Sequence, residues 1–127
     1  MNECVLDASA LLALFNNEVG ADKVETVLPH SVMSAVNASE VIAELNKKLD
    51  ISPEEGKTMI NTVTKVLPFN LDFAAKTAQL RKETLHLGLS LGDRACLALG
   101  ISLSLPVYTA DKIWQKLTLP NKIILIR

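Results

Sequence analysis

Residues 89–110 read LSLGDRACLALGISLSLPVYTA and combine a helix start, an apolar helix body and a short strand. Ser90 stands three residues before Asp93, a spacing typical of a capped helix N-terminus. The run ACLALGISLSL is apolar on nearly every side, which predicts a buried helix. Residues 107–109 then have the pattern of a strand. A buried helix that leads into a strand is typical of a parallel sheet covered by helices.

The same alternation of short apolar runs and helical segments extends through the rest of the chain. Strand candidates stand at residues 4–6, 31–35, 66–69, 107–109 and 123–126. Because strands separated by helices pair in parallel, the sequence predicts an α/β protein, a three-layer α/β/α sandwich with a mainly parallel five-stranded sheet. The chain has 127 residues, 49% of them hydrophobic, so a single domain over residues 1–127 is expected.

Cap signals set the expected helix boundaries. Ser9 is expected to cap a helix through ALLALFNN, and Asn37 precedes the amphipathic stretch ASEVIAELNKKL. Ser52 is followed by a proline and two glutamates, which is a strong helix start. Asp72 is expected to start one continuous helix that ends at Gly88, a residue suited to a helix C-terminus.

Composition argues against several classes of function. Aromatic residues make up only 4% of the chain, which disfavours a module that stacks nucleic-acid bases, and the formal net charge is -1. Cys4 and Cys96 lie in apolar contexts without metal-type spacing and are expected to be reduced core thiols. MNECVLDAS at the N-terminus does not resemble a secretory signal, and no apolar run has transmembrane length. A soluble, cytoplasmic protein is therefore expected.

Four acidic residues stand where ligands bind in α/β proteins. Asp7 directly follows a predicted strand, and Asp111 follows the stretch PVYTA at 106–110, which contains another. Glu40 and Asp93 lie in the first turns of predicted helices. Because these positions meet at one edge of a parallel sheet, the four carboxylates are expected to converge. Carboxylates that repel one another need a counter-charge, and oxygen ligands suit Mg²⁺ or Mn²⁺, which favours metal-assisted hydrolysis of a phosphodiester.

Each of these acids also has a purely structural explanation. Glu40 stands three residues after Asn37, a spacing similar to that of a capping box, and Asp93 has the cap spacing described above. Asp7 could act as a charge at a helix N-terminus, and Asp111 could cap the short segment KIWQKL. A cap and a metal ligand are compatible roles. The shared placement at one sheet edge favours the joint interpretation.

Four segments resemble the PIN-domain ribonucleases, and among them the small VapC-type toxins of prokaryotic toxin–antitoxin pairs. The segments are VLDASALLAL near the start, SAVNASEVIAEL at 34–45, LSLGDRACLALG at 89–100 and VYTADKIW at 107–114. Their order and spacing cover nearly the whole chain, and the last two are the most specific. The resemblance implies a sheet in the order 3-2-1-4-5.

The resemblance also implies a role for each matching residue. The catalytic and metal-binding acids that it implies are Asp7, Glu40, Asp93 and Asp111. Of these, Asp111 would be a fourth acid that often acts through water, and Ser9 and Thr109 match small hydroxyl positions beside the site. The family implies an endoribonuclease that depends on Mg²⁺ or Mn²⁺, forms a homodimer, and is inhibited by a cognate antitoxin whose segment fills the active-site groove.

RNA that approaches a carboxylate site needs positive charge nearby to hold its phosphates. Arg94 and Lys112 are candidates for such substrate contacts. Arg94 could equally pair with a neighbouring acid or lie in solvent in the first helical turn. The sequence alone leaves these alternatives open.

Two other classes of protein compete with the nuclease interpretation. A phosphoacceptor receiver domain has a similar length and plan, but it predicts an acidic pair after the first strand, where this chain has Asp-Ala-Ser at 7–9. A non-catalytic binding module that retains the same fold is the other alternative that the sequence leaves open. A test for RNA cleavage separates the nuclease from the binding module.

Overall fold

A five-stranded sheet forms the centre of the computed structural model, which describes residues 1–127. The strands are β1 (Cys4–Leu6), β2 (Ser31–Ser34), β3 (Lys65–Leu67), β4 (Val107–Thr109) and β5 (Ile123–Leu125). Their order is β3-β2-β1-β4-β5, and every neighbouring pair is parallel. The predicted fold class and strand order are confirmed.

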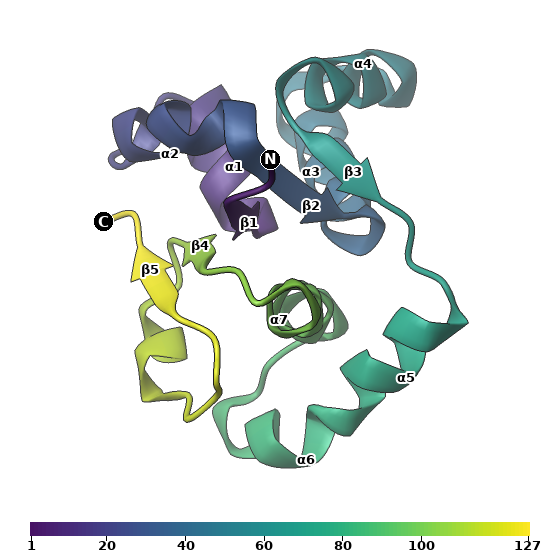
Figure 1. Cartoon of the computed structure of the whole chain (residues 1–127). Helices are drawn as coiled ribbons and strands as arrows, with labels where there is room; N and C mark the ends of the chain where they lie inside the picture. Colours follow the sequence, from purple (N-terminus) through teal and green to yellow (C-terminus); the bar gives the residue numbers. More distant parts are fainter.

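Helices cover both faces of this sheet, which gives the predicted three layers (Figure 1). One face carries α1 (Ala8–Phe15), α2 (Ala21–Val27), α3 (Ala35–Leu49) and α4 (Pro53–Val63). The other carries α5 (Leu71–Gln79), α6 (Arg81–Thr84) and α7 (Leu91–Leu103). Short 3-10 helices, η1, η2 and η3, span Leu28–His30, Leu85–Leu87 and Lys112–Lys116. None of the helices has the length and apolar sequence that crossing a bilayer requires.

The central strand β1 divides the core into two parts. Its first and last residues, Cys4 and Leu6, pack among the side chains of α1 to α4. The middle residue, Val5, packs on the opposite face of the sheet against α7. All three residues are buried, because alternate side chains of a strand point to opposite faces and both faces are covered. This strand therefore fixes the residue that follows it, Asp7, at the middle of the sheet edge.

The apolar helix predicted from the opening stretch is α7, and it is buried. Its residues from Ala95 to Gly100 all lie in the interior. Gly100 allows the helix to approach β4 closely, since an added Cβ would lie 2.5 Å from Cγ2 of Val107. The later turns of α7 therefore pack directly against the start of β4.

Several predicted helix starts are shifted in the structure. Asp7, and not Ser9, caps α1 by accepting the Ala10 N–H. Ser34 caps α3, so that helix begins before Asn37, and Glu40 lies in its second turn instead of the predicted first turn. Asn70 caps α5, which ends at Gln79 instead of continuing to Gly88. In each case a side chain closer to the end of the preceding strand accepts a free amide of the first turn, which local spacing alone did not reveal.

Candidate active site

Four carboxylates from four separate elements line one pocket of about 200 Å³. We call it the acid pocket, and its lining residues are Asp7, Ala8, Ser9, Leu12, Asn37, Glu40, Asp93 and Asp111. The fold explains the convergence, since β1 and β4 end at this edge while α3 and α7 begin there. The four acids predicted from the sequence are therefore brought together.

Asp7 is the most buried of the four, with only 5% of its surface exposed. Its Oδ1 accepts hydrogen bonds from Ser9 Oγ (2.7 Å) and from the Ala10 N–H (2.8 Å), and its Oδ2 accepts one from Thr109 Oγ1 (2.5 Å). Burial raises the pKa of Asp7 from 3.8 to about 6, and the nearby charge of Asp93 adds to this effect. The three hydrogen bonds act in the opposite direction, because they favour the carboxylate.

Ser9 and Thr109, the two predicted hydroxyl positions, connect Asp7 to the end of β4. Ser9 Oγ accepts the Ala110 N–H at 2.9 Å, and Thr109 Oγ1 accepts the Asp111 N–H at 3.0 Å. The two hydroxyl oxygens lie 3.4 Å apart. This network ties α1 to β4 and holds the Asp7 carboxylate in one orientation.

Glu40 accepts a hydrogen bond from the side chain of Asn37. The sequence indicated only that the two residues have a spacing similar to that of a capping box. Asn37 Nδ2 donates to Glu40 Oε1 at 2.9 Å and to the carbonyl oxygen of Gly92 at 3.0 Å. Gly92 itself lies against the Glu40 carboxylate, since a Cβ at this position would lie 2.5 Å from Glu40 Cδ. Sequence reasoning missed Gly92, although a glycine directly before a candidate ligand in an apolar helix is a recognisable signal of close approach.

Asp93 and Asp111 line the pocket and cap helices at the same time. Asp93 Oδ2 accepts the Ser90 N–H at 3.0 Å, and Ser90 Oγ accepts the Asp93 N–H at 3.2 Å, which forms the expected capping box. Asp111 Oδ1 accepts the Ile113 N–H at 3.1 Å at the start of η3. Each carboxylate is thus fixed through one oxygen by its own cap.

The donor set of the acid pocket fits a hard divalent cation. Its ionisable side chains are all carboxylates, which Mg²⁺ and Mn²⁺ prefer. Cys96 is fully buried nearby, and its pKa is raised well above 9.0 by burial and then by the charges of Asp7, Asp93 and Glu40, so it stays a neutral thiol. No three His, Cys, Asp or Glu side chains are already arranged to chelate an ion. An ion that keeps several of its waters suits such spacing.

The two predicted cationic contacts are not among the residues that line the acid pocket. Arg94 Nη1 donates to the Thr77 carbonyl oxygen at 3.4 Å, and its Nε is buried without a hydrogen-bond partner. Its guanidinium therefore joins α7 to α5. Lys112 is exposed at the start of η3. Neither residue lines the pocket, so RNA contact by Arg94 and Lys112 stays a prediction.

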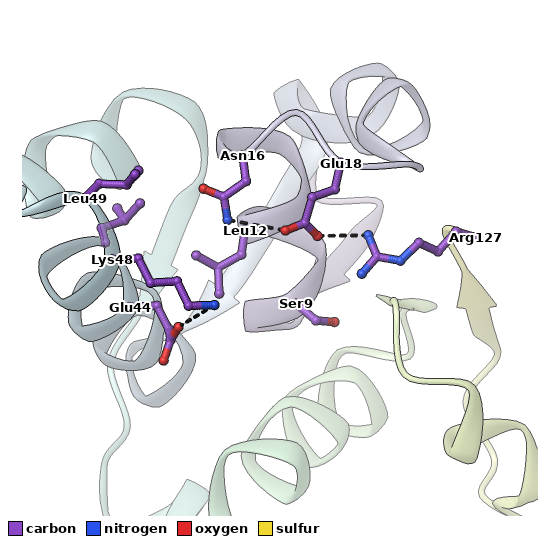
Figure 2. Close-up of a pocket in the computed structure, with 9 residues that line it drawn as sticks. Ser9, Leu12, Asn16, Glu18, Glu44, Lys48, Leu49 and Arg127 are labelled. Carbon is purple, nitrogen blue, oxygen red and sulfur yellow. Dashed lines mark hydrogen bonds and ion pairs between the residues drawn. The ribbon is translucent and has the colours of Figure 1, made fainter.

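A second pocket of about 140 Å³ adjoins the acid pocket and shares Ser9 and Leu12 with it. Figure 2 shows this pocket with its two ion pairs. The ion pairs are Lys48 with Glu44 (3.2 Å) and the C-terminal residue Arg127 with Glu18 (3.0 Å). The groove beside the acids is therefore lined by both signs of charge.

Comparison with known proteins agrees with this arrangement. A model of the PIN domain family matches residues 4–118. A chain of the DNA-bound VapBC from Salmonella typhimurium has a TM-score of 0.75 at 18% identity, with 100% of each chain covered. A chain of a toxin–antitoxin complex from Klebsiella pneumoniae has a TM-score of 0.76 at 20% identity, with 98% of each chain covered.

A further structural match is VapC20 from Mycobacterium tuberculosis, a toxin that cleaves the sarcin–ricin loop. It has a TM-score of 0.72 at 15% identity, over 87% of this chain and 91% of that one. At these identities the structural matches show a shared fold. No curated protein sequence matches the chain significantly.

Proposed function

We propose, from the premise that this chain belongs to the PIN domain family, that it is an endoribonuclease dependent on Mg²⁺ or Mn²⁺. The observation that carries the proposal is the acid pocket, in which four carboxylates from distant parts of the sequence meet at the carboxyl edge of the sheet. Asp7 is buried in this pocket, and the charge of Asp93 adds to the burial that raises its pKa, so a divalent cation bound here would relieve both effects.

Each acidic residue has a distinct part in the proposed reaction. The carboxylates of Asp7, Glu40 and Asp93 would hold the ion through oxygen atoms, and Asp111 would act through water. A bound ion supplies an activated water nucleophile and stabilises charge at the phosphorus and the leaving oxygen. The chain keeps Asp7 oriented through Ser9 and the end of β4, so its carboxylate needs no reorganisation when the ion binds.

We further propose that the protein is the toxin of a type II toxin–antitoxin pair. Structural relatives named as VapBC and as a toxin–antitoxin complex support this biological role. The partner is then an antitoxin, a segment of which would cover the acid pocket and the adjoining pocket of Figure 2, because the two pockets share Ser9 and Leu12 in their linings. A homodimer is also proposed. Identification of the protein encoded next to this chain's gene, followed by co-purification, tests the antitoxin partner.

Of the competing interpretations, the receiver domain is disfavoured by the sheet. Receiver domains have the strand order 2-1-3-4-5, whereas this sheet has the order 3-2-1-4-5. A non-catalytic module with the PIN fold stays the alternative. The two proposals differ only in whether the acid pocket performs chemistry.

RNA cleavage by the purified chain tests the proposal. We expect cleavage of single-stranded RNA with Mn²⁺ or Mg²⁺ and none with EDTA. Asp7→Asn should lower the rate by about 100-fold or more, which corresponds to about 2.7 kcal/mol of lost transition-state stabilisation. Asp72→Asn is the matched control, since Asp72 is exposed in the first turn of α5 and does not line the acid pocket.

Two outcomes would count against the nuclease. One is an Asp7→Asn variant that cleaves as fast as the wild type. The other is a folded, partner-free wild type that binds RNA and cleaves none with either ion, which would favour the non-catalytic module.

A further inference from the structure

Asn37 is the one uncharged amide side chain in the acid pocket, and it is almost completely buried, with 1% of its surface exposed. Both of its hydrogen bonds are made by Nδ2, which donates to Glu40 and to the carbonyl oxygen of Gly92. Its Oδ1 is buried and has no hydrogen-bond partner. Because two acceptors fix the amide nitrogen, the orientation of the whole group is determined.

These two hydrogen bonds join the elements that carry two of the acids. Asn37 and Glu40 lie in α3, while Gly92 lies in the first turn of α7, directly before Asp93. The missing side chain of Gly92 lets the Glu40 carboxylate lie against α7. The position of Glu40 relative to Asp93 therefore depends on the Asn37 bridge.

A role in packing alone does not explain an amide side chain at position 37. An apolar side chain of similar size would fill the same space without leaving Oδ1 buried and unpartnered, which is an unfavourable state for a polar atom. The amide instead provides a donor, Nδ2, to the Glu40 carboxylate. This donor serves a site that must hold several anions close together, because it offsets part of the negative charge of Glu40.

We infer that Asn37 is a positioning residue of the ion site, which holds the Glu40 carboxylate beside Asp93 and thereby increases the affinity for the divalent cation. The inference rests on the proposed metal-dependent function of the acid pocket. Asn37 acts through Glu40, in the way that hydrogen-bond partners of metal ligands orient those ligands in other proteins.

Mn²⁺ binding to the full chain tests this role without any measurement of cleavage. The dissociation constant is measured for the wild type and for Asn37→Leu from the electron paramagnetic resonance signal of free Mn²⁺. Loss of a partner that orients a ligand typically weakens metal affinity by about 10- to 100-fold, and we expect this for Asn37→Leu. Thr64→Val is the control, because it removes a buried hydrogen bond to Ser31 (2.6 Å) at the opposite end of β2. It should leave Mn²⁺ affinity unchanged.

A double-mutant cycle separates positioning from a general structural effect. In a Glu40→Gln background the carboxylate that Asn37 orients is already gone, so adding Asn37→Leu should change Mn²⁺ affinity by less than about threefold. An equally large loss in both backgrounds would show that Asn37 does not act through Glu40 and would overturn the inference.

The wild-type chain provides a measurement that does not depend on how the variants fold. Saturation with Mg²⁺ should shift the side-chain ¹⁵N resonance of Asn37, because its Nδ2 is bonded to Glu40, and should leave that of exposed Asn61 in place. An unshifted Asn37 resonance in a chain that binds Mg²⁺ overturns the inference and leaves the nuclease proposal standing. A wild type that binds neither ion overturns both, because no ion site then exists for Asn37 to position.

Discussion

Replacement of Asp7 by asparagine is expected to stabilise the metal-free protein near neutral pH. Asp7 is buried, and its pKa is raised from 3.8 to about 6 in the folded chain. The folded protein therefore binds this proton more tightly than the unfolded chain does. As pH rises through this interval, the unfolded chain ionises first, so the free energy of unfolding falls.

The magnitude follows from the two pKa values. A shift from 3.8 to about 6 corresponds to about 3 kcal/mol in the free energy of unfolding. The wild type loses this stability as the pH rises from about 4 to about 6, and it lacks this stability at higher pH. Asparagine keeps the shape of the neutral acid and still accepts from Ser9 and Ala10 through its oxygen. Asp7→Asn should consequently match the wild type at about pH 4 and exceed it by up to about 3 kcal/mol at about pH 7.5.

Urea unfolding of the two proteins in EDTA at a series of pH values is the assay. The difference between the two free energies of unfolding isolates Asp7, since the other groups titrate in both proteins. Asp72→Asn serves as the exposed control and should give no pH-dependent difference. The prediction is wrong if Asp7→Asn is less stable than the wild type at about pH 7.5. It is also wrong if the difference in free energy of unfolding between the two proteins is the same at about pH 4 and about pH 7.5.

Three further substitutions probe the acid pocket. Gly92→Ala places a Cβ against the Glu40 carboxylate. It should lower the free energy of unfolding in urea by about 1–3 kcal/mol and weaken Mn²⁺ binding in calorimetry. Unchanged Mn²⁺ binding would contradict this contact. Thr109→Val removes a donor that lowers the pKa of Asp7, so the midpoint of Mn²⁺ binding against pH should move upward; a downward movement would be inconsistent with the hydrogen bond. Asp111→Asn should slow RNA cleavage less than Asp7→Asn does, because Asp111 is proposed to act through water; an equal loss would place it among the direct ligands.

The sequence predicted the parts of this site that depend on the order of elements. Asp7 and Asp93 could be placed at the sheet edge because a strand end and a capped helix start each have a local sequence signal. The capping box of α7 and the buried helix behind it were likewise correct. These features arise from interactions between residues a few positions apart.

The features that sequence reasoning missed depend on contacts between distant segments. Asn37 donates to Gly92, 55 positions away, and no local pattern indicates that α3 and α7 approach so closely. The stretch expected to be one helix up to Gly88 is divided into α5, α6 and η2, although Gly88 does adopt the expected left-handed conformation with φ 67°. The helical periodicity of this segment does not predict where the helix is interrupted, because tertiary packing can override local helix propensity.

The position of a bound ion is the most direct test of the account. Crystals of the wild-type chain grown with Mn²⁺ should show an anomalous-scattering peak in the acid pocket, next to the carboxylates of Asp7, Glu40 and Asp93. The Asp7→Asn protein should lose that peak or show it much weakened. A saturating Mn²⁺ concentration that leaves the acid pocket without a peak, or that places the ion elsewhere on the chain, would contradict the account.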